Sequence, residues 1–198
     1  PTRRSSDLLV GCLIVKDGKV IGKGFHRAFG ESHAEVNAVK DAKRNGFDLE
    51  GATVYVNLEP CSHRGNTGPC ALMLKNEMPD KVVIGMQDPY EKVNGKGIKI
   101  LKQAGIKVVE GVLQNECIEF NKFFINFVTK KRPFVTLKIA QSIDGMIALN
   151  NNDSKYITSE SSRKIVHKMR SEYDAVLIGT NTAMLDNPKL DARLTKGR

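Results

Sequence analysis

The chain has 198 residues, of which 40% are hydrophobic and 27% are charged, and its formal net charge is +9 at pH 7. This is an ordinary globular composition with room for one domain and part of a second, and no apolar run is long enough to span a bilayer. The positive charge suits a polyanionic partner or a phosphorylated small molecule, and equally a generic solvated surface.

The cysteines and the first residues indicate where the protein works. Four unevenly spaced cysteines do not indicate a secreted disulfide scaffold, and no signal-peptide pattern is visible. We therefore expect a protein of the reducing cytoplasm, where a cysteine pair more often binds metal or acts in catalysis. The opening PTRRSSDL matches nothing that follows, and one frame of a common sequencing-library adapter encodes it. We predict a non-native leader over residues 1–8.

From Leu9 the chain alternates between strand and helix patterns. The run LVGCLIVKDGKVIGKGF predicts two strands around Asp17-Gly18, and SHAEVNAVKDAKRNG predicts a helix from an N-cap at Ser32 to a stop at Gly46. Further strands are predicted at 52–58, 81–86 and 106–112, and helices at 69–75, 95–105 and 115–131. The apolar side of the last helix is assigned to the core, with Ile118, Phe123, Ile125 and Phe127. This order predicts a three-layer α/β/α domain with a mixed, mostly parallel sheet.

A second domain is predicted after the segment KKRPFV. We place the first domain at residues 9–129 and the second at 130–198. In the second domain, residues 134–149 predict a fresh strand and turn, 154–173 a helix after a short extended stretch, and 174–188 a strand that enters a polar loop. No further strands follow that could finish a second sheet, so we predict that this domain is truncated.

Three residues with the side chains that zinc prefers stand at element boundaries. His33 lies at the mouth of a predicted helix, Cys61 follows a strand end, and Cys70 falls in the first turn of another helix, where the helix dipole favours a thiolate. Three protein ligands leave a fourth position for water, which is typical of catalytic zinc. Glu35 could then take a proton from that water and pass it to a leaving amine.

Other interpretations of these residues stay open at this point. Ser32 and Glu35 also form a capping-box pattern. His63 as a fourth ligand would close the site and make a structural zinc module that binds nucleic acid through its basic surface. Cys12 and Cys117 are assigned to the core. The combination of H-x-E with two P-C pairs is nevertheless the signature of zinc deaminases, although eight residues between the cysteines argue against a nucleic-acid deaminase.

Over residues 9–198 the sequence resembles the bifunctional riboflavin-biosynthesis deaminase–reductase family. The resemblance rests on long ordered stretches that include SHAEVNAV, GATVYVNLEPCSH, LKIAQSIDGMIA and GTNTAMLDNPKLDAR. It implies a cytidine-deaminase-like zinc domain that deaminates a diaminopyrimidine ribosyl phosphate. It also implies a dihydrofolate-reductase-like α/β domain that reduces the ribosyl group to ribityl with NADPH. Another small-molecule or tRNA deaminase on the same fold is the alternative enzyme.

The resemblance also implies roles for individual residues. It makes zinc ligands of His33, Cys61 and Cys70 and a proton shuttle of Glu35. The residues that fall where the family contacts NADPH are Ala140, Tyr156, Thr182 and Asp186. The residues that fall where it holds the reductase substrate are Ser154, Arg170, Leu190 and Arg193. The two guanidinium groups suit a phosphate, and a surface salt bridge is their alternative role.

Several positions depart from the family pattern. SSDLLVG stands where the family has PNPxVG, Asn66 replaces a basic phosphate partner, and Tyr90 replaces an asparagine. The Gly-rich NADPH segment of the family would lie beyond Arg198. These departures leave the zinc chemistry intact and bear on substrate affinity. As partners we expect the phosphorylated pyrimidine, NADPH and further copies of the chain, and neither a membrane nor nucleic acid.

Overall fold

A computed structural model describes residues 8–63, 68–91, 93–151 and 153–195. The chain divides between Pro133 and Phe134 into two compact units, which are treated separately below. The domain boundary at residues 129/130 stays a prediction, and residues 1–7 of the predicted leader lie outside the described residues. None of the helices in the described ranges is long and apolar enough to cross a membrane.

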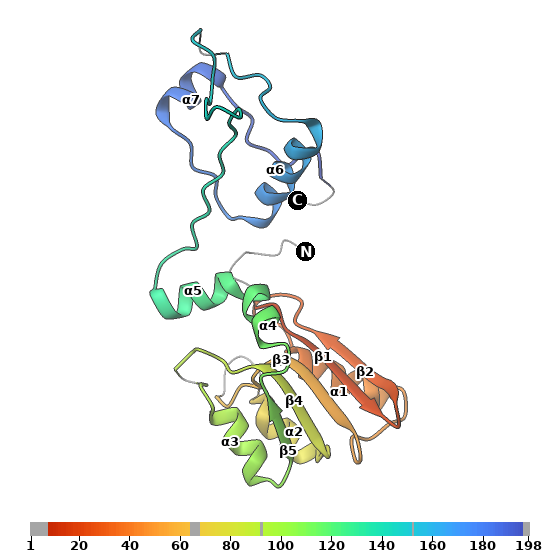
Figure 1. Ribbon diagram of the computed structural model, residues 1–198. Coiled ribbons are helices and arrows are strands. Elements are labelled where there is room, and N and C mark those ends of the chain that lie inside the picture. The colour runs from red at the N-terminus through yellow and green to blue at the C-terminus, as the bar shows by residue number, and fades with distance from the viewer. Residues whose placement is uncertain (1–7, 64–67, 92, 152, 196–198) are drawn as a thin grey trace. The chain divides into compact units, whose positions relative to one another are not determined.

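A five-stranded sheet forms the centre of the first unit (Figure 1). Its strands are β1 (Gly11–Lys16), β2 (Lys19–Phe25), β3 (Thr53–Leu58), β4 (Lys81–Met86) and β5 (Lys107–Glu110). They lie in the order β2-β1-β3-β4-β5. The β1–β2 hairpin is antiparallel, β1 also runs antiparallel to β3, and the β3–β4 and β4–β5 pairs are parallel. The mixed sheet is confirmed, although only half of the pairs described are parallel.

Helices cover both faces of this sheet. On one face lie α1 (Ala34–Arg44), α2 (Cys70–Glu77) and α3 (Lys96–Gln103). Their buried side chains share one apolar core with alternate residues of the strands, such as Ile84. The next residue, Gly85, points to the opposite face, where an added Cβ would lie 2.4 Å from the sulfur of Cys117 on α4 (Gln114–Phe120). The predicted α/β/α layering is therefore confirmed.

The single helix predicted over 115–131 is wrong. The structure has two helices, α4 and α5 (Lys122–Lys130), which are separated at Asn121. The Asn121 side chain is buried and bonds the backbone of Leu9, accepting its N–H at 2.9 Å and donating to its carbonyl at 3.2 Å. This long-range pairing interrupts a locally helical sequence. The predicted core positions Ile118 and Phe127 are exposed, at 38% and 57%.

The second unit has two helices in its described residues, α6 (Glu160–Glu172) and α7 (Thr180–Asp186). The helix predicted within 154–173, after a short extended stretch, is confirmed in α6, whose N-cap Ser159 accepts the N–H of Ser162. The strands predicted within 134–149 and 174–188 are wrong for the described residues, and α7 replaces the predicted polar loop. An extended sequence becomes a strand only when a neighbour pairs with its backbone, and Val135 and Leu177 are correspondingly exposed, at 83% and 97%.

Close backbone packing between β2 and α1 should make Gly24 sensitive to substitution. An added Cβ would lie 2.3 Å from the Ala34 carbonyl oxygen and 2.4 Å from the Ala38 nitrogen, and neither backbone atom can rotate away. We expect Gly24→Ala to lower the free energy of unfolding by about 1–3 kcal/mol, measured by urea denaturation. Gly11→Ala is the matched control, because a Cβ there meets nothing within 4 Å. Equal stability of the two variants would contradict this packing argument.

Candidate metal centre

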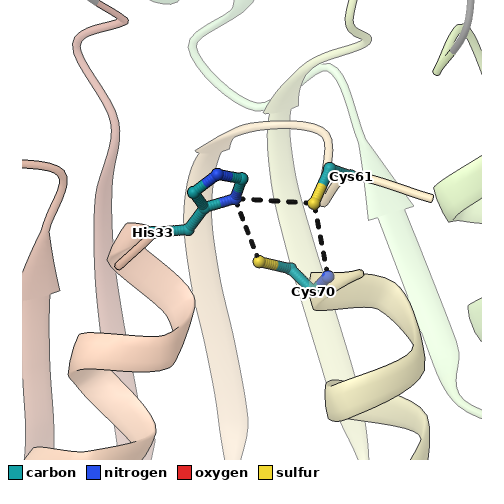
Figure 2. A group of neighbouring side chains, drawn as sticks. All are labelled: His33, Cys61 and Cys70. Carbon is teal, nitrogen blue, oxygen red and sulfur yellow. Dashed lines mark hydrogen bonds between the residues drawn. The ribbon is translucent and has the colours of Figure 1, made fainter. Parts of the chain in front are cut away.

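Two helix starts and one strand end bring the predicted ligands together. His33 is the N-cap residue of α1, Cys70 is the first residue of α2, and Cys61 lies in the loop that leaves β3. Figure 2 shows the three side chains pointing toward one another, with Cys70 at the start of its helix. Both helices therefore direct their N-terminal ends, which carry partial positive charge, at the sulfur atoms.

The ligand atoms of this group lie at metal-site distances. The Nδ1 atom of His33 is 3.5 Å from Cys61 Sγ and 3.3 Å from Cys70 Sγ, and all three ligand atoms lie within 4.8 Å of one another. In a tetrahedral zinc site with bonds of ~2.0–2.3 Å, ligand atoms stand roughly 3.5 Å apart. One imidazole and two thiols are also a donor set that zinc prefers, so the residues present fit this ion.

The two cysteines differ in how readily they ionise. A hydrogen bond from the Cys70 thiol, helped by His33 and by the Cys70 backbone N–H at 3.3 Å, lowers the pKa of Cys61 to about 4. The same thiol–thiolate hydrogen bond, together with burial, raises the pKa of Cys70. Without a cation the pair therefore shares a proton, and a dication would displace that proton on binding.

Glu35 is buried beside the ligands, with 3% of its surface exposed. The capping box with Ser32 is wrong, because α1 is capped at His33 without a side-chain hydrogen bond and Glu35 lies in the first turn. Burial raises the pKa of Glu35 to about 7. A carboxyl group that titrates near neutral pH is suited to take up and release a proton.

A cavity of about 50 Å³ opens beside the cluster and has room for water. Its lining includes three residues that the sequence argument missed, His26, Glu59 and Asp88. The His26 ring meets the His33 ring edge-on, with 5.6 Å between centroids, and burial raises the pKa of Asp88 to about 6. Asp88 could have been found, because it follows β4 as Cys61 follows β3, and neighbouring parallel strands end at the same edge.

The four-ligand alternative has no support in the described part of the chain. The only group of potential metal ligands found there is His33, Cys61 and Cys70. His63 is exposed, and its ring stands edge-on to Tyr90 with 6.3 Å between centroids. Asn66, the other position of interest in this loop, lies outside the described residues. The structure therefore favours three protein ligands, the pattern of a catalytic site.

The two remaining cysteines lie apart from the cluster. Cys12 is 1% exposed within the core on β1, which confirms its assignment to the core. Cys117 is half-buried on α4, on the other face of the sheet. All four cysteines are free.

In the second unit, two of the predicted substrate residues meet at one aspartate. Arg170 donates to the backbone carbonyl of Asp191 at 3.2 Å, and Arg193 forms an ion pair with the Asp191 carboxylate. Leu190 adjoins them in sequence, and the half-buried Ser154 lies in the stretch before α6. Arg170 of α6 and Arg193 thus both contact Asp191, and the Arg193 contact is a salt bridge.

The predicted NADPH residues are spread over three stretches of the same unit. Thr182 and Asp186 lie one turn apart on α7, and Ala140 is half-buried in an irregular stretch. Tyr156 is 70% exposed, and the Arg163 guanidinium lies over its ring at 4.2 Å. An aromatic ring and a guanidinium in such a stack suit a planar or anionic ligand.

Comparison with known families matches both units. The family model described as the cytidine and deoxycytidylate deaminase zinc-binding region matches residues 2–86. The model described as the RibD C-terminal domain matches residues 133–198. The two matches follow each other in the order of the two units.

Known relatives extend over nearly the whole chain. The riboflavin biosynthesis protein RibD of Actinobacillus pleuropneumoniae is 45% identical over 190 residues, which cover 96% of this chain and 50% of that protein. The protein of the same name from Escherichia coli is 42% identical and is matched over 93% of this chain and 49% of its own length. The chain therefore spans about half the length of the curated relatives it matches.

Solved structures agree with these sequence relatives. A diaminohydroxyphosphoribosylaminopyrimidine deaminase/5-amino-6-(5-phosphoribosylamino)uracil reductase from Thermotoga maritima has a TM-score of 0.89 and 48% identity. The match covers 96% of this chain and 54% of that one. The RibD structure from Acinetobacter baumannii, form 1, has a TM-score of 0.82 and 42% identity, covering 93% of this chain and 51% of that one.

The ligand cluster predicts a single zinc ion per chain that depends on Cys70. We expect the chain to be purified with zinc, and Cys70→Ala to lose most of it, because one of the three donor atoms is gone. Metal content by plasma mass spectrometry gives the measurement. Cys117→Ala is the control and should keep its zinc. Full zinc occupancy in Cys70→Ala would count decisively against the site.

Proposed function

Because this chain belongs to the RibD family, we propose that its first unit is a zinc-dependent deaminase of riboflavin biosynthesis. The proposed substrate is a 2,5-diamino-6-(ribosylamino)pyrimidinone 5'-phosphate, whose exocyclic amine is hydrolysed. We propose that the second unit belongs to the NADPH-dependent reductase that converts the ribosyl side chain of the product to ribityl. The net charge of +9 suits both phosphorylated ligands.

One observation carries the deaminase assignment. A buried carboxyl group, Glu35, lies against a three-ligand cluster of one imidazole and two thiols. His33, Cys61 and Cys70 are the proposed zinc ligands. A zinc ion held there supplies an activated water as the nucleophile of a hydrolytic deamination.

Glu35 performs the proton transfers in this proposal. Its carboxylate accepts a proton from the attacking water and passes it to the exocyclic nitrogen of the pyrimidine. The carbon–oxygen bond forms, the carbon–nitrogen bond breaks, and the amine leaves as ammonia. Burial supports this role, because it places the pKa of Glu35 at about 7, where the group can both accept and return a proton at neutral pH.

In the second unit the proposed roles follow the family pattern. Arg170 and Arg193 hold the substrate phosphate, with Ser154 and Leu190 beside them. Arg170 and Arg193 both reach Asp191, which holds their guanidinium groups near one point. The ion pair between Arg193 and the Asp191 carboxylate is also the surface salt bridge named above as the alternative role. The residues proposed to contact NADPH are Ala140, Tyr156, Thr182 and Asp186.

The proposal includes a homo-oligomer in the cytoplasm. Ligand thiols must stay reduced to bind zinc, and a reducing compartment keeps them so. Leu13 and Tyr55 pair across β1 and β3 on the sheet face that points away from α1, and they are 45% and 43% exposed. This exposed apolar pair supports contact with another copy of the chain.

Glu35→Gln should keep zinc and fold while it loses deamination. The amide cannot carry the proton, and general acid–base groups typically contribute ~10²–10⁴-fold to the rate. Ammonia release from the diaminopyrimidine ribosyl phosphate gives the measurement, with zinc content and melting temperature recorded beside it. Glu31→Gln removes an exposed carboxylate from the loop before α1 and serves as the control. Near-normal turnover in Glu35→Gln would contradict the proposed role.

The same assay tests the substrate class. We expect ammonia from the diaminopyrimidine ribosyl phosphate, and little from cytidine or from an adenosine-containing tRNA anticodon stem. Release of ammonia from one of the latter two alone would replace the proposed function with that of another deaminase on the same fold.

A further inference from the structure

Glu59 is a buried carboxylate that the chemistry above does not use. It directly follows β3 and stands two positions before Cys61, and only 3% of its surface is exposed. A buried carboxylate is costly unless hydrogen bonds compensate its charge. The partners of this group therefore indicate what it does.

Four backbone N–H groups bind this carboxylate. Its Oε1 atom accepts the N–H of Gly97 at 2.9 Å and that of Ile98 at 3.2 Å, both in the first turn of α3. Its Oε2 atom accepts the N–H of Gly95 at 2.9 Å and that of Asp88 at 3.2 Å. The positive end of the α3 dipole adds to these charge-assisted bonds. The Glu59 side chain thus connects the end of β3 to the start of α3 and to Asp88, two positions after β4.

Gly97 shows how closely these segments are packed. A Cβ at this position would lie 2.0 Å from the backbone carbonyl oxygen of Pro60 and 3.2 Å from Glu59 Oε1. The first turn of α3 therefore presses directly on the backbone that leads from Glu59 to Cys61. A shift of α3 would be transmitted to a proposed zinc ligand.

Asp88 links Glu59 to the cavity, because Glu59 binds its backbone and its side chain lines the cavity. Its own side chain is 6% exposed and lines the cavity that Glu35 and Cys61 also line. The Asp88 carboxylate accepts the N–H of Tyr90 at 2.8 Å, while the Asp88 N–H is held by Glu59. Backbone and side chain of Asp88 are thus fixed from two directions.

We propose that Glu59 is a positioning residue of the deaminase: its carboxylate sets where Asp88 and the start of α3 lie relative to Glu35 and Cys61, and so controls how tightly the pyrimidine substrate is held. This inference rests on the proposed function. The proposed effect is on substrate binding and not on proton transfer, because Asp88 lines the cavity while Glu35 and the ligand group lie on other elements.

The charge and both oxygens of Glu59 are needed for this role. A glutamine has one acceptor oxygen and one amide NH₂ group, which would face two backbone N–H donors. Two buried N–H groups would then lose their partners, in either the Oε1 pair or the Oε2 pair. Loss of the Oε2 pair releases Asp88 and Gly95, and loss of the Oε1 pair releases Gly97 and Ile98 in α3.

The first measurement does not require activity. In the zinc-loaded full chain we expect Glu59→Gln to accelerate amide hydrogen exchange about tenfold or more, either at the N–H groups bound by Oε1 or at those bound by Oε2. We also expect the carboxyl NMR resonance of Asp88 to shift. Amides within α1 should not change. Glu110→Gln is the control, since the exposed Glu110 at the end of β5 pairs with Lys102 of α3 at 2.6 Å, away from the first turn of that helix. An unchanged Asp88 resonance in Glu59→Gln overturns the proposal.

The second measurement separates positioning from stability. We expect Glu59→Gln to raise KM for the diaminopyrimidine phosphate about tenfold, with kcat within about threefold and zinc content unchanged. A lowered melting temperature with an unchanged KM would show a purely structural role and overturn the proposal. If wild-type protein releases no ammonia, the proposed function fails, and the Asp88 resonance still decides whether Glu59 positions this wall.

A milder variant covers the case in which Glu59→Gln does not fold. Glu59→Asp keeps the charge and both oxygens but withdraws them by one methylene. It should show a smaller rise in KM and a smaller shift of the Asp88 resonance. Wild-type values for both quantities in Glu59→Asp would likewise overturn the proposal.

Discussion

The carboxyl end of β3 is the point from which the proposed active site is built. β3 lies in the middle of the sheet and pairs with β1 on one side and with β4 on the other. Immediately beyond its last residue come Glu59 and then Cys61, which meet the starts of α3 and α2 through backbone N–H groups. A strand held on both sides cannot slide, so the residues that leave it have fixed positions.

Compensation of negative charge explains why helix starts surround this point. Glu35 and Glu59 are both buried, and Cys61 carries a lowered pKa. Glu59 is compensated by four backbone N–H groups, so it needs no cation. Glu35 and the cysteine pair face one another and have only His33 as a side-chain counterpart within the ligand group. A dication is the natural complement of such a set, because it removes the repulsion between the carboxylate and the thiolates.

The second unit differs from the first in that many of its apolar side chains are exposed. Its described helices α6 and α7 are joined by irregular stretches whose apolar side chains, such as Leu137 and Leu177, are exposed at 81% and 97%. Strand-forming residues of this kind join a sheet only when a neighbouring strand pairs with their backbone, and the described residues of this unit contain no strand. The contacts described in this unit centre on α6, which has its Ser159 cap and, in Arg170, a donor to the Asp191 carbonyl 21 residues along the chain.

Local sequence determined most of the order of strands and helices in the first unit, and it singled out His33, Cys61, Cys70 and Glu35 as candidates, because each depends on patterns within a few residues of chain. Tertiary structure decided what depends on distant partners. The break at Asn121 comes from hydrogen bonds to Leu9, 112 residues away, and the places of Glu59 and Asp88 come from a bond across 29 residues. Tertiary structure also decided that the extended segments after Pro133 remain unpaired among the described residues. Periodicity records which face of an element is apolar, whereas a buried polar group is positioned by whichever partner the folded chain brings to it.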